Sequence, residues 1–237
     1  MAEATTPAHP PAERILAAAA DLLRRGGIDA VSTRAVATEA GVQPPTIYRQ
    51  FGDKDGLLDA VTRHVLQHYI DRKRLLTDPD EDPAVVLREL WDLHVEFGLQ
   101  QPHCYLLTYG QAKRTSAADE TVAILTEVIS RLGAAGRLTM SVGRATNYFR
   151  STGAGFVTTQ LSLPPEERDP DLSRILFENT LAAISTDGGR VRGRKPNDVR
   201  ARAVALREVL PESGASGLSA AEQSLLAEWL NRLADQA

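Results

Sequence analysis

The sequence predicts an all-α protein, in which a small N-terminal helical domain precedes a larger helical bundle. Three observations predict this class. Apolar residues recur at three- and four-residue spacing along most of the 237 residues. No segment alternates apolar and polar residues over a strand-length stretch, so we expect no sheet. Glycines and prolines separate the periodic stretches, as they do between helices.

The first two predicted helices are delimited by caps and glycines. One covers about residues 12–25 and stops at Gly26-Gly27, because glycine adopts the left-handed C-terminal conformation without a steric penalty. The other begins after Ser32, a residue type whose hydroxyl accepts from a free backbone amide, and it ends at Gly41.

The next two predicted helices differ in length. The third covers about residues 44–50, and its first turn holds Pro44-Pro45, which need no amide donor there. The fourth covers 54–76, is capped by Asp53 and connects the two domains. A loop rich in proline and acidic residues follows at 78–83.

Helical patterns continue to the end of the chain. An Asp169-Pro170 pair opens one helix, and Ser219 with Glu222 forms a capping box at another. The predicted helices are about 83–100, 103–110, 117–134, 141–162, 170–185, 197–210 and 219–235. The expected domains are a disordered tail 1–11, a small helical domain 12–58, a larger helical domain 59–186, and a C-terminal helical extension 187–237.

The composition is that of a globular protein, with 43% hydrophobic and 24% charged residues. The net charge is −4, so a broad positive field is excluded as the basis of nucleic-acid binding. No apolar run reaches the roughly 18 residues of a membrane helix, and no secretory signal is recognisable, so we expect a cytoplasmic protein. The single cysteine, Cys104, excludes an internal disulfide.

Residues 32–58 carry the most informative pattern. Two short predicted helices flank Gly41, and Ala37 is small enough to let them cross closely, as in a helix-turn-helix. The second helix of that motif enters the major groove of DNA. Its polar positions here carry hydroxyl, guanidinium and amide groups, which pair with phosphates, guanine and adenine. The sequence therefore predicts a DNA-binding motif.

Three segments together resemble the DNA-binding domain of TetR-family regulators: VSTRAVATEAGV at 31–42, PTIYRQF at 45–51 and KDGLL at 54–58. The resemblance covers about residues 12–60. It implies that residues 12–58 are a three-helix DNA-binding domain, that residues 59–186 are a divergent helical domain for ligand binding and dimerisation, and that the protein is a homodimer. Gln43 departs from the family pattern, because many members have a serine there that caps the recognition helix.

The predicted DNA-binding residues come from this segment. The resemblance places Thr46, Tyr48 and Lys54 against the DNA backbone, while Tyr48 could alternatively serve packing alone. The full set is Thr33, Arg34, Gln43, Pro45, Thr46, Tyr48, Arg49, Gln50 and Lys54.

The helical body holds aromatic and polar residues that suit either a ligand pocket or an ordinary core. The candidate ligand-binding residues are Trp91, His94, Phe97, Tyr105, Tyr109, Asn147, Tyr148 and Phe156. His64 and His68 have metal-ligand spacing, but no third ligand completes a site, so we expect no metal and no cofactor.

Dimerisation is expected through the helices at 141–162 and 170–185. The small residues 153–155 would let two helices approach closely, and an apolar stripe follows on the second helix, comprising Leu172, Ile175, Leu176, Leu181 and Ile184. The alternative is that this stripe packs within the monomer. A basic cluster, Arg190, Arg192, Arg194 and Lys195, is expected to be a solvated loop.

These features predict a transcriptional regulator, most simply a repressor that a small-molecule effector releases from a palindromic DNA operator. An enzyme is not expected, because the sequence lacks a nucleophile–base pattern and a phosphate-binding glycine loop. An interaction protein with a vestigial helix-turn-helix is the other alternative.

Overall fold

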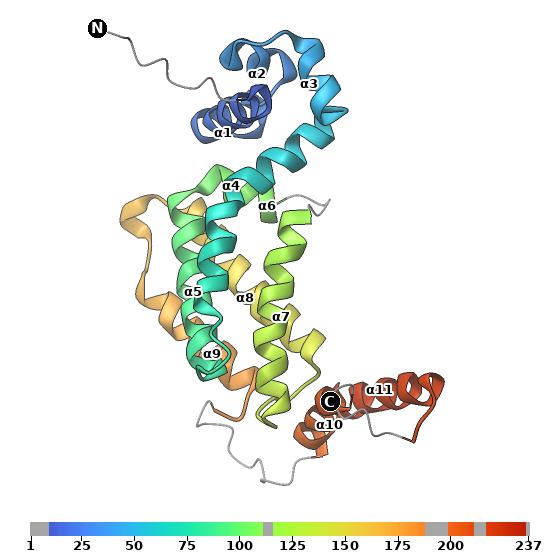
Figure 1. Ribbon diagram of the computed structural model, residues 1–237. Helices are drawn as coiled ribbons and strands as arrows, with labels where there is room; N and C mark the ends of the chain where they lie inside the picture. Colours follow the sequence, from blue (N-terminus) through green and yellow to red (C-terminus); the bar gives the residue numbers. More distant parts are fainter. Residues whose placement is uncertain (1–9, 111–115, 188–198, 211–216, 236–237) are drawn as a thin grey trace, which may run out of the picture. The chain divides into compact units, whose positions relative to one another are not determined.

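The computed structural model describes residues 10–110, 116–187, 199–210 and 217–235, and these form helices with no named strand (Figure 1). The predicted all-α class is confirmed. None of the described helices is long and apolar enough to cross a membrane. The helices are α1 (Pro11–Ala30), α2 (Thr33–Ala40), α3 (Pro44–Phe51), α4 (Lys54–Leu76), α5 (Pro83–Gln100), α6 (Pro102–Tyr109), α7 (Ser116–Ala134), α8 (Val142–Ser162), α9 (Asp171–Ile184), α10 (Val199–Val209) and α11 (Ala220–Asp235).

The predicted helix bounds agree with these to within one or two residues, except at the end of α1. That helix extends to Ala30, but Gly27 interrupts it with φ 67° and ψ −166°. The predicted stop at Gly26-Gly27 is therefore correct for the regular helix, and one further turn follows. The predicted tail at 1–11 and the basic cluster at 190–195 lie largely or wholly outside the described residues.

The predicted helix caps are present. Ser32 Oγ accepts from the Ala35 amide at 3.1 Å, and Gly41 ends α2 at φ 63°. The Ser219 and Glu222 side chains each accept from the other residue's backbone amide, as the capping box requires. Because these signals are local, they are readable from sequence alone.

Contacts divide the chain into two units. Unit 1 comprises 1–71 with 100–120, and unit 2 comprises 72–99 with 121–237. Helix α4 contributes to both, and α6 belongs with the N-terminal helices. The domain limits predicted at residues 58 and 186 stay predictions.

Unit 1 is built on α1, which packs against α2 and α6. The apolar face of α1 buries Ile15, Ala19 and Leu23 completely, and Val36 of α2 and Ile47 of α3 are also fully buried. Gly27 lies against α6, because a Cβ there would sit 3.3 Å from His103 Nδ1. The three N-terminal helices are therefore held as one packed group.

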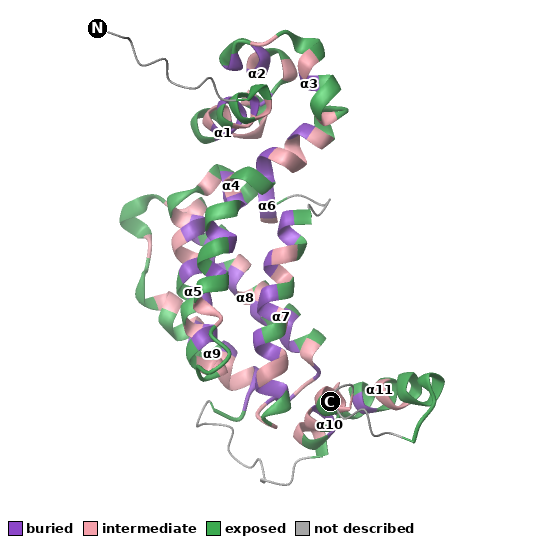
Figure 2. Cartoon of the chain, viewed as in Figure 1, coloured by how far each residue is buried: buried purple, intermediate pink, exposed green. Residues whose placement is uncertain are grey.

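The core of unit 2 takes buried residues from α5, α7, α8 and α9 (Figure 2), and three aromatic side chains meet in it. Trp91 of α5 is fully buried, with its ring edge-to-face to Phe149 of α8 at 5.4 Å and to Phe177 of α9 at 5.9 Å. Its indole N–H donates to Ser173 Oγ at 3.0 Å. The ring is therefore buried without leaving its N–H donor unsatisfied.

The loops at one end of unit 2 are joined by Arg137. Its guanidinium forms two hydrogen bonds to Asp82, at 2.9 and 3.1 Å, and also bonds Asp187 at 2.6 Å. Asp82 also caps α5 by accepting from the Ala84 amide. The two carboxylates raise the pKa of Arg137 and Arg137 lowers that of Asp82. Three chain segments distant in sequence are thereby fixed together.

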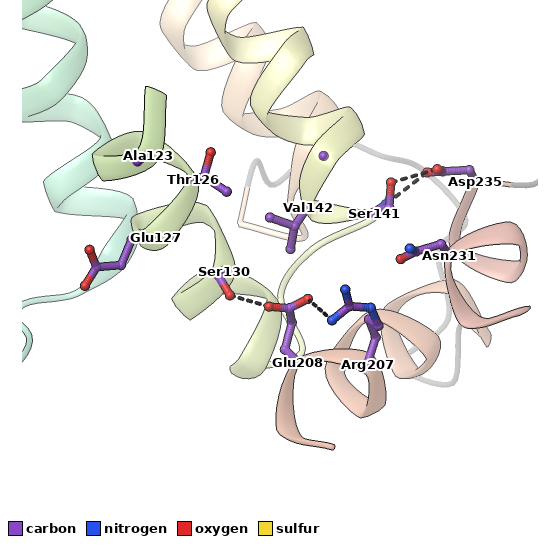
Figure 3. Close-up of a pocket in the computed structure, with 11 residues that line it drawn as sticks. Ala123, Thr126, Glu127, Ser130, Ser141, Val142, Arg207, Glu208, Asn231 and Asp235 are labelled. Atoms are coloured by element: carbon purple, nitrogen blue, oxygen red, sulfur yellow. Dashed lines mark hydrogen bonds and ion pairs between the residues drawn. The ribbon is translucent and has the colours of Figure 1, made fainter. Parts of the chain in front are cut away.

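The C-terminal extension packs on the body. Val204 of α10 is buried against Gly133 of α7, where a Cβ would lie 3.1 Å from it. Asp235 of α11 accepts from the Ser141 amide at 2.9 Å and the Ser141 hydroxyl at 2.7 Å, at the start of α8. Ser130 also bonds Glu208 (Figure 3).

A polar cleft of about 750 Å³ lies between α7, the start of α8, α10 and α11 (Figure 3). Its carboxylates at Glu208 and Asp235 already bond body residues. The cleft therefore lies at the interface between the C-terminal extension and the rest of unit 2.

We expect Arg137→Gln to lower the free energy of unfolding by about 2 kcal/mol, because it breaks a partly buried pair of charge-assisted contacts. The matched control is Arg232→Gln, which removes an exposed pair with Glu228 one turn away and should change stability by less than about 0.5 kcal/mol. Urea unfolding followed by tryptophan fluorescence measures both. Equal effects would contradict the structural role of Arg137.

Candidate nucleic-acid interface and ligand site

The turn between α2 and α3 has the geometry that the sequence pattern predicts. Gly41 adopts the left-handed conformation, and the Val42 amide returns to the Ala37 carbonyl at 3.0 Å. Ala37 and Ile47 are buried, so the two helices present their polar residues outward. The result is a helix-turn-helix with α3 in the position of the recognition helix.

The first turn of α3 is complete without a side-chain cap. Gln43 occupies the N-cap position but makes no capping hydrogen bond, while Pro44 and Pro45 have no amide to satisfy. The next free donor, the Thr46 amide, bonds the Gln43 carbonyl at 2.9 Å. The departure from the family's serine is thus offset locally, because two of the amides left free at a helix start are absent.

Tyr48 is available for contact with a ligand. Its side chain is 51% exposed, and its hydroxyl lies 3.5 Å from Thr33 Oγ1 at the start of α2. Two hydroxyls, one from each helix of the motif, therefore meet at the surface. This arrangement suits binding of one phosphate oxygen by both helices.

The predicted DNA-binding residues all reach the surface. Thr33 and Thr46 have intermediate exposure, and the exposed members are Arg34, Gln43, Pro45, Tyr48, Arg49, Gln50 and Lys54. In the described part of the chain, no carboxylate forms an ion pair with Arg34, Arg49 or Lys54. Their charges are therefore free for an anionic partner.

Gly56 fixes how α4 begins, a role that the sequence pattern did not assign. Asp53 Oδ1 accepts from the Gly56 amide at 2.7 Å, and a Cβ on Gly56 would lie 2.0 Å from the Phe51 carbonyl oxygen. Only glycine fits between the end of α3 and the start of α4. Lys54 depends on this junction for its position.

The predicted ligand-binding residues fall into three groups. Trp91, Phe97 and Phe156 are buried in unit 2, where His94 has intermediate exposure. Tyr105 and Tyr109 pack together in unit 1, with ring centroids 4.7 Å apart. Asn147 and Tyr148 are exposed on α8. His64 and His68 are also exposed, and no group of metal-binding side chains gathers in the described residues.

Two basic residues that the sequence analysis did not select lie near His94. Lys73 of α4 is only 5% exposed and donates to the Thr121 carbonyl of α7 at 3.1 Å. Burial and then the Arg150 charge lower its pKa to about 7. Burial, Lys73 and Arg150 lower the pKa of His94 to about 3. The available signal was the position of Lys73 on the apolar face of α4, seven residues after Leu66.

The N-terminal part of the chain is similar in sequence to known proteins. Residues 15–61 match the family described as bacterial regulatory proteins, tetR family. The class G tetracycline repressor of Vibrio anguillarum is 36% identical over 75 residues, which cover 32% of this chain and 35% of that protein. The chain thus matches about a third of the length of this curated relative.

Solved structures resemble the chain over a greater length. A TetR-family transcriptional regulator from Streptomyces coelicolor has 26% identity and a TM-score of 0.56, covering 74% of this chain and 99% of that protein. FadR of Bacillus subtilis, solved in complex with stearoyl-CoA, has 19% identity and a TM-score of 0.60, covering 73% and 98%. The similarity to FadR, at this low identity, shows a shared fold.

We expect Gly56→Ala to destabilise unit 1 far more than Gly41→Ala. The first substitution forces a carbonyl oxygen to move, whereas the second meets no atom within 4 Å and costs only the left-handed backbone strain, about 1 kcal/mol. Thermal unfolding followed by circular dichroism compares the two. Similar losses in both variants would contradict the assigned junction.

Lys73 predicts a pH-dependent stability. With its folded pKa near 7 and its unfolded value near 10.5, the unfolded state binds more protons between these values, so stability rises with pH. From pH 7 to pH 9 the wild type should gain about 2 kcal/mol relative to Lys73→Met. Parallel denaturation curves of both proteins at the two pH values give this difference, and an equal pH response would rule out the lowered pKa of Lys73.

Proposed function

We propose, from the TetR-family DNA-binding domain that the chain carries, that the protein is a transcriptional repressor released from its operator by a small-molecule effector. The exposed face of α3, together with the free charges of Arg34 on α2, Arg49 on α3 and Lys54 on α4, carries this proposal. Such a regulator acts in the cytoplasm, as a DNA-binding protein rather than as an enzyme.

In the proposed complex α3 lies in the major groove. Arg49 and Gln50 face base edges, where a guanidinium pairs with guanine and an amide with adenine. Thr46, Tyr48 and Lys54 bond phosphates and fix the register. The start of α2 supports this with Thr33, whose hydroxyl lies beside that of Tyr48.

A homodimer is proposed because two recognition helices about 34–36 Å apart match a palindromic operator. The outward face of α8 and α9 suits this role: Tyr148 and Ile175 are exposed, and no atom lies within 4 Å of a Cβ at Gly155. The expected contribution of Gly153 needs correction, because this residue is buried against Trp91 and His94 of the same chain. Ile184 is also buried within unit 2, and Leu176 and Leu181 pack against the same core, so these three residues of the predicted stripe serve the monomer.

The effector is proposed to bind in unit 2, where the buried aromatic residues and the basic groups near His94 lie. A neighbour with the same fold, FadR, was solved with stearoyl-CoA, which supports ligand binding by this class of body. A ligand changes operator affinity only by its difference in affinity for the two states of the dimer. Helix α4 contributes residues to both units and can transmit that difference.

We expect Tyr48→Ala and Lys54→Ala each to weaken operator binding about tenfold while the dimer persists. Lys54→Ala should also reduce the dependence of log K on log salt by about one unit, because one phosphate contact is lost. Fluorescence anisotropy with operator DNA measures affinity, and gel filtration checks assembly.

The matched control is Arg232→Ala, which removes an exposed positive charge from α11. Its operator affinity should equal that of the wild type. If wild-type protein bound no fragment of a broad operator library at low salt, a vestigial motif would be the better interpretation.

A further inference from the structure

A group of basic side chains converges inside unit 2. Lys73 comes from α4, His94 from α5 and Arg150 from α8. The His94 ring lies against α8, because a Cβ on Gly153 would be 3.4 Å from its Cδ2 and 3.5 Å from its Nε2. Arg150 is one turn before Gly153 on the same helix, and its charge acts on both Lys73 and His94.

The polar surroundings point to an absent partner. Thr146 of α8 is 3% exposed, and its hydroxyl has no hydrogen-bond partner among the described residues. Thr146, Arg150 and Gly153 recur at four- and three-residue spacing, so they share one face of α8. A buried hydroxyl without a partner is unfavourable, and a bound polar ligand would supply the missing hydrogen bond.

The side chain of His94 is not completely covered by its neighbours. This side chain lies deep in the protein, where burial is the largest cause of its lowered pKa, yet it keeps intermediate accessible surface. Trp91 lies beside it at the same glycine, with Cζ3 3.5 Å from the Cβ position. Phe97 and Phe156, each about one turn further along their own helices, are also buried. A charged polar end therefore adjoins an apolar wall.

We propose that Lys73, His94, Arg150 and Thr146 form a site for the carboxylate of an organic acid whose apolar part packs near Trp91. The assignment of this cluster as the regulator's effector site rests on the proposed function. An anion stabilises two neighbouring cations that otherwise repel each other, and a carboxylate accepts hydrogen bonds from ammonium, guanidinium and hydroxyl donors together. A neutral ligand of the same shape provides no such compensation.

The test uses full-length protein with Trp229→Phe, which leaves Trp91 as the single tryptophan. Trp229 is 52% exposed, so its replacement should leave the fold intact. The probes are sodium butyrate, octanoate, dodecanoate, benzoate and phenylacetate, each paired with its neutral primary amide. Saturable changes in Trp91 fluorescence report binding.

At least one acid should bind about tenfold or more tightly than its amide. Lys73→Met and Arg150→Met should each weaken that acid about tenfold, and Thr146→Val should weaken it a few-fold. Lys73→Arg should retain most of the affinity, because the charge is kept. Arg174→Met, an exposed residue of α9 paired with Glu178, is the control and should bind as the wild type.

Equal binding of acid and amide, unchanged affinity in both methionine variants, or no binding by any acid would overturn the site. Circular dichroism on each variant excludes loss of fold as the cause. Operator binding by the same preparations distinguishes the two proposals. Intact DNA binding without acid binding rejects the anion site alone, whereas acid binding without DNA binding supports the site and rejects the repressor.

Discussion

The burial of Trp91 is the interaction on which the helical body depends. One side chain of α5 contacts Phe149 of α8 and Phe177 of α9, and its N–H is satisfied by Ser173. Because interiors are packed without voids, this ring fixes where α5 lies against its two neighbours. His94, one turn later on α5, is thereby held against the glycine face of α8. The buried basic cluster is a consequence of that packing.

The helix-turn-helix depends on a different kind of constraint. Its geometry comes from local backbone chemistry. Gly41 adopts the left-handed conformation, and two prolines begin α3. Gly56 has no Cβ that would collide with the Phe51 carbonyl oxygen. Each constraint acts between residues close in sequence. The exposed polar face of α3 then follows from helical periodicity, once Ile47 is buried.

Sequence reasoning was most successful where structure is local. Helix bounds, the caps at Ser32 and Ser219, and the surface position of the DNA-binding set were all predictable, because each rests on neighbours within one turn. It was less successful inside the body. Lys73 was not predicted to be buried, because lysine is almost always exposed. Asn147 was predicted to bind a ligand, but it lies exposed on the surface.

The sequence by itself determined the all-α class, the order of the helices and the segment that forms the DNA-binding motif, because spacing and capping are properties of the chain. Tertiary structure alone decided which helices meet. It placed Arg137 between Asp82 and Asp187, attached α11 to α8 through Asp235, and gathered Lys73, His94 and Arg150 from three helices. Contacts between distant segments depend on packing of the whole core, which no local pattern specifies.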